Sequence, residues 1–398
     1  MGLNDAPSSE RIHIGFFGLM NVGKSSLINA LTAQELSLVS DIPGTTTDPV
    51  RKAMELLPLG PVVIIDTAGF DDSGELGEKR VERTKKTLGE TDIAVLVTEA
   101  GREPLPAEKE LLGLFEEKRL PFVVAQNKAD LAPSAAAADE KGGRTVRVSA
   151  VTGEGVEELK RVLGDFAREW EQDRRTLVAD LLSPSGSALL VVPIDESAPK
   201  GRLILPQQQV MRELLDRHLT FSVCQPSEVS RALDALAVRP ELVITDSQAF
   251  GAVSRLVPEE IKLTSFSILF ARYKGELSLF AAGAEKLSEL TDADRVLISE
   301  GCTHHRQCND IGTVKLPGWI KEFCGARPEF EFTSGRGFPE DLSPYSLIVH
   351  CGGCMLGERE MRSRLDAAAA QGVPVVNYGM AIARMHGILK RSLEPFSL

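Results

Sequence analysis

A short motif near the start of the chain constrains its fold more than any other feature of the sequence. Residues 18–25 read GLMNVGKS, which matches the phosphate-binding pattern GxxxxGK(S/T), and they follow the apolar run 12–17. Such a loop lies between a buried strand and a helix, because backbone N–H groups at the start of the helix point at the phosphates. The motif therefore predicts an α/β domain that binds a nucleotide.

The residue types in this loop fit the binding of a triphosphate and Mg²⁺. The glycines let the backbone wrap the phosphates, Lys24 supplies a positive charge to the β- and γ-phosphates, and the Ser25 hydroxyl can bind Mg²⁺. The predicted phosphate-binding residues of the loop are Gly18, Asn21, Val22, Gly23, Lys24, Ser25 and Ser26.

A second motif, DTAG at residues 66–69, ends the apolar run 62–65. The Asp66 carboxylate can there hold Mg²⁺ through a water molecule, and the Gly69 N–H is left for the γ-phosphate. Taken alone, DTAG also fits an ordinary junction between a strand and a turn. Its position after the phosphate loop favours the functional interpretation.

Residues 127–130, with the sequence NKAD, identify the base as guanine. The Asp130 carboxylate can accept hydrogen bonds from the guanine N1–H and 2-amino groups, a pair of donors that adenine lacks. Ser149 and Ala150 follow the next predicted strand and add a backbone N–H for the guanine O6. The predicted guanine-binding residues are Asn127, Lys128, Asp130, Ser149 and Ala150.

These loops are also expected to hydrolyse GTP. The hydroxyl-rich segment 43–48 suits a switch whose threonine senses Mg²⁺ and the γ-phosphate, and we predict Thr46 for this role; a polar loop without a ligand role is the alternative. Phe70 stands where many small GTPases have a glutamine that orients water, so we expect slow intrinsic hydrolysis. The predicted catalytic residues are Lys24, Asn21, Thr46, Asp66 and Gly69.

Apolar runs alternate with helical patterns through residues 1–172, which predicts a parallel sheet with helices on both faces. The predicted strands are 12–17, 62–65, 93–97, 122–125 and 146–148, and the predicted helices are 24–31, 79–88, 107–117 and 156–170. The alternation resumes in residues 176–264, with strands at 189–192, 220–223 and 242–245 and helices at 207–217, 228–236 and 250–257. We find no catalytic group in this second segment and expect a small α/β dimerisation domain.

Cysteines gather after two predicted strands in residues 270–398. The strand 296–299 runs into CTH at 302–304, the strand 347–349 runs into HCGGC at 350–354, and a helix at 359–370 and a strand at 373–376 follow. If these strands are parallel neighbours, both turns lie at the carboxyl edge of one α/β sheet. The candidate ligands are three cysteines, with only mobile histidines for a fourth position. This set suits an iron–sulfur cluster that has one exchangeable iron. A redox dithiol, a structural zinc site of the Cys₃His type and chance core cysteines are the alternatives.

The charge balance argues against a broad nucleic-acid surface. The net charge is −12 and the pI is about 5.2, whereas phosphate binding requires clustered Lys and Arg. The sequence has neither a signal-like start nor an apolar run of about 20 residues, so we expect a cytoplasmic protein without a membrane span. In a reducing compartment, clustered cysteines favour metal or redox roles over disulfides.

The first domain resembles the potassium-dependent GTPases of the Era and MnmE type. In those proteins the residue that matches Asn21 helps to hold a K⁺ ion against the phosphates, so the resemblance implies K⁺-stimulated hydrolysis. A polar loop residue that binds no ion is the alternative for Asn21. A GTPase of this type that acts on RNA or the ribosome, with a structural zinc site, is the alternative function for the whole chain.

Over essentially its full length the chain resembles the HydF family, the GTPases of FeFe-hydrogenase maturation. The resemblance rests on the domain order and on the motifs CTH and HCGGC, which 45 residues separate. It implies a homodimer with a 4Fe–4S cluster on Cys302, Cys351 and Cys354, whose fourth position is labile or taken by His304 or His350. It also implies a scaffold that receives a two-iron subcluster precursor from two radical-SAM maturases and delivers it to apo FeFe-hydrogenase.

Overall fold

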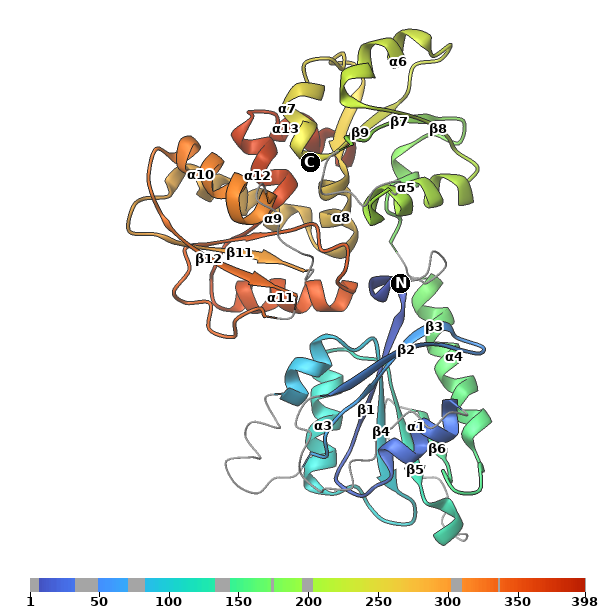
Figure 1. Cartoon of the computed structure of the whole chain (residues 1–398). Helices are drawn as coiled ribbons and strands as arrows, with labels where there is room; N and C mark the ends of the chain where they lie inside the picture. The colour runs from blue at the N-terminus through green and yellow to red at the C-terminus, as the bar shows by residue number, and fades with distance from the viewer. Residues whose placement is uncertain are drawn as a thin grey trace. The chain divides into compact units, whose positions relative to one another are not determined.

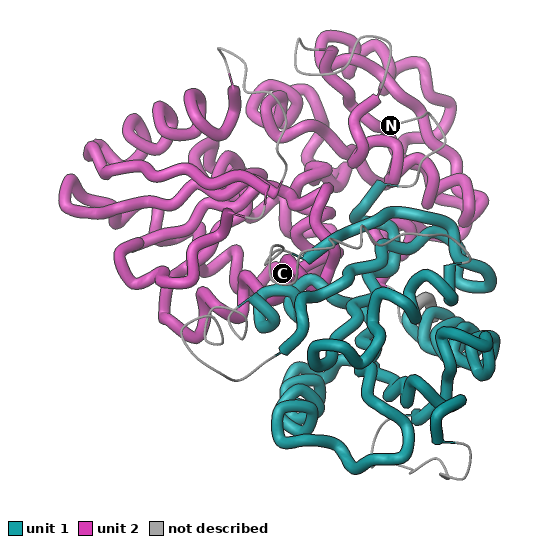
Figure 2. The backbone as a smooth tube through the Cα atoms, turned by 60° about the horizontal axis from the view of Figure 1, so that its bottom comes forward, with its two compact units in different colours: residues 1–174 teal, residues 175–398 magenta. Residues whose placement is uncertain are grey.

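Parallel β-sheets organise both halves of the chain. The computed structural model describes residues 7–32, 49–70, 83–132, 144–172, 175–194, 203–301, 310–335 and 337–397. The chain divides into two units, Met1–Arg174 and Arg175–Leu398 (Figure 2). Within the described ranges, no helix has both the length and the apolar character needed to cross a bilayer.

The first unit contains a six-stranded sheet in the order β2-β3-β1-β4-β5-β6 (Figure 1). Neighbouring strands are parallel except β2, which runs antiparallel to β3 at the edge. The strands are β1 (Ile12–Phe17), β2 (Val50–Leu56), β3 (Gly60–Asp66), β4 (Ile93–Glu99), β5 (Phe122–Asn127) and β6 (Arg144–Arg147). All five predicted strands are confirmed, with β6 starting earlier than expected, and β2 was not predicted.

Helices cover both faces of this sheet, as the sequence predicts. One apolar core lies between the sheet and helices α1 (Lys24–Thr32) and α4 (Val156–Gln172). A second core, which includes Phe17 and Phe115, lies on the other face under α3 (Pro106–Glu117). The described part of this sheet is therefore packed against helices on both faces.

The second unit contains two four-stranded sheets, and every strand pair in them is parallel. The first sheet has the order β10-β9-β7-β8, and the second has the order β12-β11-β13-β14. The strands are β7 (Ser187–Val191), β8 (Thr220–Cys224), β9 (Leu242–Thr245), β10 (Lys262–Ser265), β11 (Arg295–Glu300), β12 (Glu329–Ser334), β13 (Leu347–His350) and β14 (Val375–Asn377). The α/β fold class is confirmed, whereas β10 and β12 were not predicted.

The helices of this unit join its two sheets through a shared core. They are α5 (Leu205–Asp216), α6 (Val229–Ala235), α7 (Phe250–Val253), α8 (Phe266–Lys274), α9 (Leu277–Glu285), α10 (Leu316–Cys324), α11 (Glu358–Ala370), α12 (Tyr378–Met385) and α13 (Leu389–Leu393). One cluster of buried side chains runs from Leu189 and Val243 in the first sheet to Ile298 and Val349 in the second. The turn after β13 is therefore held by a continuous packed unit.

Candidate functional site

The phosphate loop after β1 has the backbone that its sequence predicts. Gly18 and Gly23 have φ values of 146° and 88°, which side chains other than glycine rarely adopt. A Cβ on Gly18 would lie 2.3 Å from the Val97 carbonyl oxygen, and one on Gly23 would lie 2.4 Å from Asn127 Nδ2. Both glycines are thus required by close packing as well as by backbone conformation.

Lys24 lies at the start of α1 and is buried. Its Nζ donates hydrogen bonds to the carbonyl oxygens of Gly18, at 3.1 Å, and Leu19, at 2.8 Å, so the ammonium group points back into the phosphate loop. This direction brings the charge to the concave side of the loop, where β- and γ-phosphates bind in proteins with this motif.

Ser25 and Asp66, the two described residues that are predicted to hold Mg²⁺, lie side by side. Ser25 Oγ donates to Asp66 Oδ2 at 2.7 Å, although the two residues come from α1 and the end of β3. The other oxygen, Asp66 Oδ1, is buried and has no hydrogen-bond partner among the described residues. Burial raises the pKa of Asp66, and the Ser25 hydrogen bond and the Lys24 charge oppose that shift. A buried carboxylate oxygen beside a hydroxyl fits a Mg²⁺ ion.

The DTAG loop packs directly on the phosphate loop. A Cβ on Gly69 would lie 2.8 Å from the Met20 nitrogen, and the Phe70 N–H donates to the Gly18 carbonyl oxygen at 3.1 Å. The Phe70 side chain is buried in the apolar core beneath. Phe70 therefore cannot orient a water molecule for attack. Thr46, the predicted switch residue, lies outside the described residues.

Asn127 connects the base-binding loops to the phosphate loop. Its Nδ2 donates to the Val22 carbonyl oxygen at 2.9 Å, and its Oδ1 accepts from the Ala150 N–H at 3.1 Å. Ser149 Oγ donates to Asp130 Oδ1 at 2.6 Å, which fixes the carboxylate that is predicted to read guanine. Four of the five predicted guanine-binding residues are thus held by these hydrogen bonds, which we call the Asn127 network: Asn127, Asp130, Ser149 and Ala150.

A charged pair beside this network was not predicted from the sequence. Lys128 Nζ forms an ion pair with Glu99 at the end of β4, and Glu99 also pairs with Arg102 at 3.6 Å. The Lys128 hydrogen bond lowers the pKa of Glu99. Lys128 has a left-handed backbone with φ 61°, a conformation that residues other than glycine rarely adopt. The ion pair directs its side chain toward Glu99.

In the second unit, two cysteines follow β13 at the carboxyl edge of the sheet. Strands β11 and β13 are parallel neighbours, with Ser299 opposite His350, and the Cys351 N–H donates to the Ser299 carbonyl oxygen at 3.0 Å. Gly301, which follows β11, therefore lies beside Cys351. The expected meeting of the two strand ends is confirmed.

Two backbone N–H groups point at the Cys351 sulfur. Gly301 N lies 3.0 Å from Sγ and Gly353 N lies 3.3 Å from it. Burial raises the pKa of the Cys351 thiol to about 11, while these N–H groups oppose the shift, and burial also raises the pKa of Cys354. N–H donors on a buried sulfur stabilise its thiolate form, which is the form that binds metal.

Cys302 and His304 lie outside the described residues. Among the residues that the structure does describe, no three His, Cys, Asp or Glu side chains are grouped so that they could hold a metal ion. Cys351 and Cys354 are both free and partly buried. Assignment of the three-cysteine set therefore depends on Cys302, which follows Gly301 directly in the chain.

His350, the other predicted ligand, is buried with both ring nitrogens in hydrogen bonds. Nδ1 lies 2.8 Å from the Cys351 carbonyl oxygen, and Nε2 lies 3.2 Å from Arg364 Nη1. Burial lowers the pKa of His350 to about 3, and the Arg364 charge lowers it further. The ring is therefore neutral, with its proton on Nδ1. Ligation by His350 would require Nε2 to exchange Arg364 for iron, and that role stays a prediction.

Two buried charged residues beside the cysteine turn were missed by the sequence reasoning. Lys274, at the end of α8, reaches the turn from 79 positions earlier in the chain. Glu300, the last residue of β11, is buried and lies near the Tyr378 hydroxyl. Lys274 belongs to no local motif, so only the fold brings it to the cysteines. Glu300 lies two positions before Cys302 in the chain, and the pairing of β11 with β13 brings it near Cys351.

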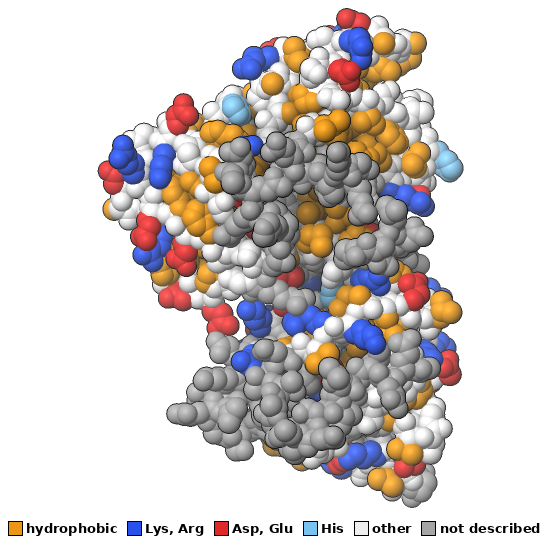
Figure 3. Space-filling view, in the orientation of Figure 1, with side chains coloured by type: hydrophobic (Ala, Val, Ile, Leu, Met, Phe, Trp, Pro, Cys, Tyr) orange, Lys and Arg blue, Asp and Glu red, His pale blue; other side chains and the backbone are white. Residues whose placement is uncertain are grey.

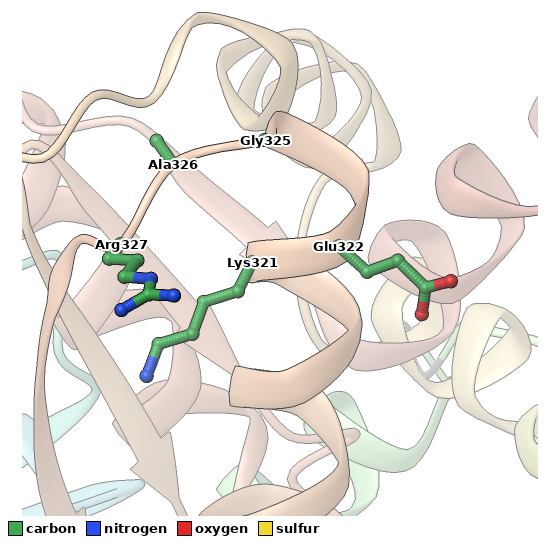
Figure 4. Close-up of a pocket in the computed structure, with 5 residues that line it drawn as sticks. All are labelled: Lys321, Glu322, Gly325, Ala326 and Arg327. Atoms are coloured by element: carbon green, nitrogen blue, oxygen red, sulfur yellow. The ribbon is translucent and has the colours of Figure 1, made fainter.

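An open pocket at the end of α10 is separate from both sites. Lys321, Glu322, Gly325, Ala326 and Arg327 line it; the side chains of Lys321 and Arg327 lie near each other, and Glu322 points away (Figure 4). Arg327 precedes the parallel strand β12, so the pocket lies at the amino edge of the sheet, opposite the cysteine turn. It contains no cysteine and does not contribute to the predicted chemistry.

Family models match three successive segments of the chain. The model described as a 50S ribosome-binding GTPase matches residues 13–128, the hydrogen maturase F dimerization domain matches residues 177–275, and the hydrogen maturase F tetramerization domain matches residues 278–395. The two maturase models together cover more than half of the chain. The chain belongs to the hydrogen maturase F (HydF) family. It is therefore a GTPase involved in hydrogenase maturation, and its domains indicate oligomerisation.

Several tRNA modification GTPases called MnmE are similar to part of the chain. The tRNA modification GTPase MnmE of Chromobacterium violaceum is 42% identical over 156 residues, which are 39% of this chain and 34% of that protein. MnmE of Aquifex aeolicus is 39% identical over 152 residues, which are 38% of this chain and 33% of that protein. The chain thus spans about a third of the length of these relatives. Their likeness gives the RNA-directed alternative no support beyond the first unit.

Two solved GTPase structures are also similar to part of the chain. The G domain of the T. maritima FeoB iron transporter is 27% identical, with 40% of this chain and 99% of that chain covered and a TM-score of 0.32. Era of Aquifex aeolicus bound to GDP and aluminium fluoride is 23% identical, with 39% and 56% covered and a TM-score of 0.32. The GTPase family model and the loop geometry indicate that GTP or GDP and Mg²⁺ are the ligands of the first unit of this HydF-family chain.

Proposed function

We propose that this chain is a carrier in FeFe-hydrogenase maturation. It binds a 4Fe–4S cluster through Cys302, Cys351 and Cys354, receives a two-iron precursor from radical-SAM maturases and delivers it to apo FeFe-hydrogenase. Residues 176–264 form its dimerisation domain and residues 270–398 its cluster-binding domain. Membership of the HydF family and the cysteine arrangement support this proposal.

The single observation that carries the proposal is the environment of the Cys351 sulfur. Backbone N–H groups from Gly301 and Gly353 both point at it, and the first of these lies directly before Cys302. Hydrogen bonds of this kind to cysteine sulfur set the reduction potential of iron–sulfur clusters. The donor set is made of thiols rather than carboxylates, which fits iron–sulfur chemistry. A cluster on three cysteines supplies one iron with an exchangeable position, to which His304, His350 or the cargo could bind.

The first sheet of the second unit supports a homodimer. Strand β8 lies at the edge of this sheet, and no strand among the described residues pairs with its outer side. Exposed apolar side chains lie on β8 and around α5: Val223 is 48% exposed, Leu215 60% and Leu203 39%. Hydrophobic side chains gather around these elements on the face shown in Figure 3. An unpaired apolar edge strand favours pairing with a second copy.

A potassium ion at the phosphate loop is part of the proposal for GTP hydrolysis. Asn21 is exposed and has φ 62°, a conformation that asparagine tolerates better than most residues. Asn21→Ala would change the backbone preference as well as the amide, so Asn21→Gly is the cleaner variant. We expect faster hydrolysis in KCl than in NaCl for the wild type and no difference for Asn21→Gly. Equal wild-type rates in the two salts would contradict a potassium site.

The carrier function is tested by transfer to a hydrogenase. The chain is loaded with cluster and precursor, separated from the maturases and mixed with apo FeFe-hydrogenase, and hydrogen evolution is then measured. We expect activation by the wild type and by Cys324→Ala, which alters a cysteine in α10 away from the turn, and no activation by Cys351→Ala. Equal activation by Cys351→Ala and the wild type would contradict the proposal.

A further inference from the structure

Lys274 is the most deeply buried lysine among those discussed, with 2% of its surface exposed. Its Nζ donates to three carbonyl oxygens of the turn after β13: Gly353 at 2.9 Å, Cys354 at 3.2 Å and Leu356 at 2.6 Å. Burying an ammonium group is costly unless hydrogen bonds replace its water. A fold that buries this charge against one turn therefore gives that turn a defined shape.

The three acceptors belong to the segment that carries the cysteines. Gly353 has φ 63°, its carbonyl oxygen faces Lys274, and its N–H points at Cys351 Sγ. One peptide segment is thus fixed from both sides, by an ammonium group behind it and a sulfur in front. Without the Lys274 donors, the carbonyl groups of the turn would be free to move. The Gly353 N–H would then no longer be held in its hydrogen bond to Cys351 Sγ.

The charge of Lys274 also acts on the cysteines directly. The Lys274 Nζ lies 3.2 Å from the carbonyl oxygen of Cys354, so its positive charge is buried next to that cysteine. A 4Fe–4S cluster on three thiolates carries net negative charge in both of its states and gains one further negative charge when it accepts an electron. A fixed positive charge in a buried environment stabilises the more negative state more strongly.

We propose that Lys274 is a positioning residue that holds the 351–356 turn in its cluster-binding shape and makes the reduction potential of the bound cluster more positive. The inference rests on the proposed cluster site. Residues that orient metal ligands from behind affect metal affinity about 10- to 100-fold when they are changed. Lys274 does not touch the cluster in this role; it acts through the backbone of the turn and through its charge.

Two variants separate the contribution of the hydrogen bonds from that of the charge. Lys274→Met removes both and leaves an unbranched apolar side chain that suits a buried site. Lys274→Gln removes the charge but keeps N–H donors. Arg272→Met is the matched control, because Arg272 lies on the same helix but pairs with Asp180 at the surface. Near-UV circular dichroism and gel filtration report the folding of each variant.

The experiment uses the full-length chain reconstituted with iron and sulfide under anaerobic conditions. A dithionite titration followed by EPR measures the one-electron potential of the cluster, and a ferrous chelator measures the rate at which iron is lost. We expect a more negative potential in both Lys274 variants, and about 10-fold faster iron loss in Lys274→Met than in the wild type, with a smaller change in Lys274→Gln. Arg272→Met should match the wild type in both measurements.

If the Lys274 variants had the same reduction potential and the same rate of iron loss as the wild type, the inference would be overturned. The proposed cluster site would still stand. A wild-type chain that shows no iron–sulfur signal would instead overturn the proposed function, and the role of Lys274 with it. The same negative shift in Arg272→Met would also count against the inference, because any lost charge would then have the effect ascribed to Lys274.

Discussion

Two buried lysines show how the two units of this chain build their sites. Lys24 donates to carbonyl oxygens of the phosphate loop only five and six positions before it, whereas Lys274 donates to carbonyl oxygens 79 to 82 positions after it. Lys24 lies on the concave side of its loop and can exchange the carbonyl groups for phosphate oxygens. Lys274 lies behind its turn, where it holds the backbone carbonyl groups and places a buried positive charge near the cysteines.

The phosphate loop is thus a local structure, whereas the cysteine turn depends on tertiary contacts. The phosphate loop forms wherever one strand and one helix flank it, because its donors are consecutive N–H groups. The sulfur of Cys351 depends on a neighbouring strand for one donor and on its own turn for the other. Changes far from each motif in the chain should therefore affect the cysteine turn more than the phosphate loop.

The largest expected effect is on the local site. Lys24→Met should reduce GTP hydrolysis about 100-fold or more, because it removes the charge that stabilises the transferred phosphoryl group. Single-turnover hydrolysis measures this, with Lys160→Met as control, because Lys160 pairs with Glu157 on α4 and belongs to none of the nucleotide motifs. The two proteins should bind iron equally. A Lys24→Met chain that hydrolyses GTP at the wild-type rate would refute the phosphate-loop assignment.

The next effect concerns recognition of the base. Asp130→Asn replaces two acceptor oxygens with one acceptor and one donor, so we expect about 10- to 100-fold weaker GDP binding. Calorimetry measures the affinity, and xanthosine diphosphate should gain what GDP loses. Asp165→Asn, on the surface of α4, is the matched control. Unchanged GDP affinity in Asp130→Asn would break the assignment of the guanine site.

A smaller effect tests whether the cysteine turn is under tertiary control. Gly353→Ala places a Cβ 2.3 Å from Met361 Cε at a residue with φ 63°, and we expect it to lower the free energy of unfolding of the metal-free chain by about 1–2 kcal/mol. Gly318→Ala, with nothing within 4 Å of its Cβ in helix α10, should leave stability unchanged or raise it by about 1 kcal/mol. Urea unfolding followed by circular dichroism distinguishes them, and equal midpoints would count against a constrained turn.

The smallest effect concerns the ion pair beside the guanine site. Glu99→Gln removes the negative charge that pairs with Lys128. Both side chains are more than a third exposed, Glu99 at 38% and Lys128 at 34%. Ion pairs of this exposure contribute about 0–1 kcal/mol, so we expect GDP affinity to fall by no more than about fivefold. A loss as large as that of Asp130→Asn would mean that Lys128 has a larger role than the structure indicates.

The sequence predicted the elements whose pattern is local. Strands β1, β3, β4 and β5 are short apolar runs, and the GTPase motifs follow them directly. Strand β2 was missed because it is an edge strand with Arg51, Lys52 and Glu55 in it, and such a strand lacks a continuous apolar run. Strand β12 was missed for the same reason, since Glu329 and Glu331 alternate with Phe330 and Phe332 at the sheet edge.

The sequence predicted those residues of the candidate sites that belong to local motifs. Asp66, Asp130 and Cys351 could be named because their neighbours in the chain define their roles. The Asn127 network, the burial of His350 against Arg364 and the contact of Lys274 with the turn could not, because each depends on pairs of residues that only the folded chain brings together. A buried charge leaves no periodic or local signature in a sequence.

The central claim is that three cysteines of the second unit bind one iron–sulfur cluster. The most direct measurement is iron and sulfide analysis with EPR on anaerobically reconstituted wild type, Cys302→Ala, Cys351→Ala and Cys354→Ala. The account predicts about four irons per wild-type chain and a reduced-cluster signal that each substitution abolishes. Stoichiometric zinc without iron in the wild type, or a full cluster signal in any of the three variants, would contradict it.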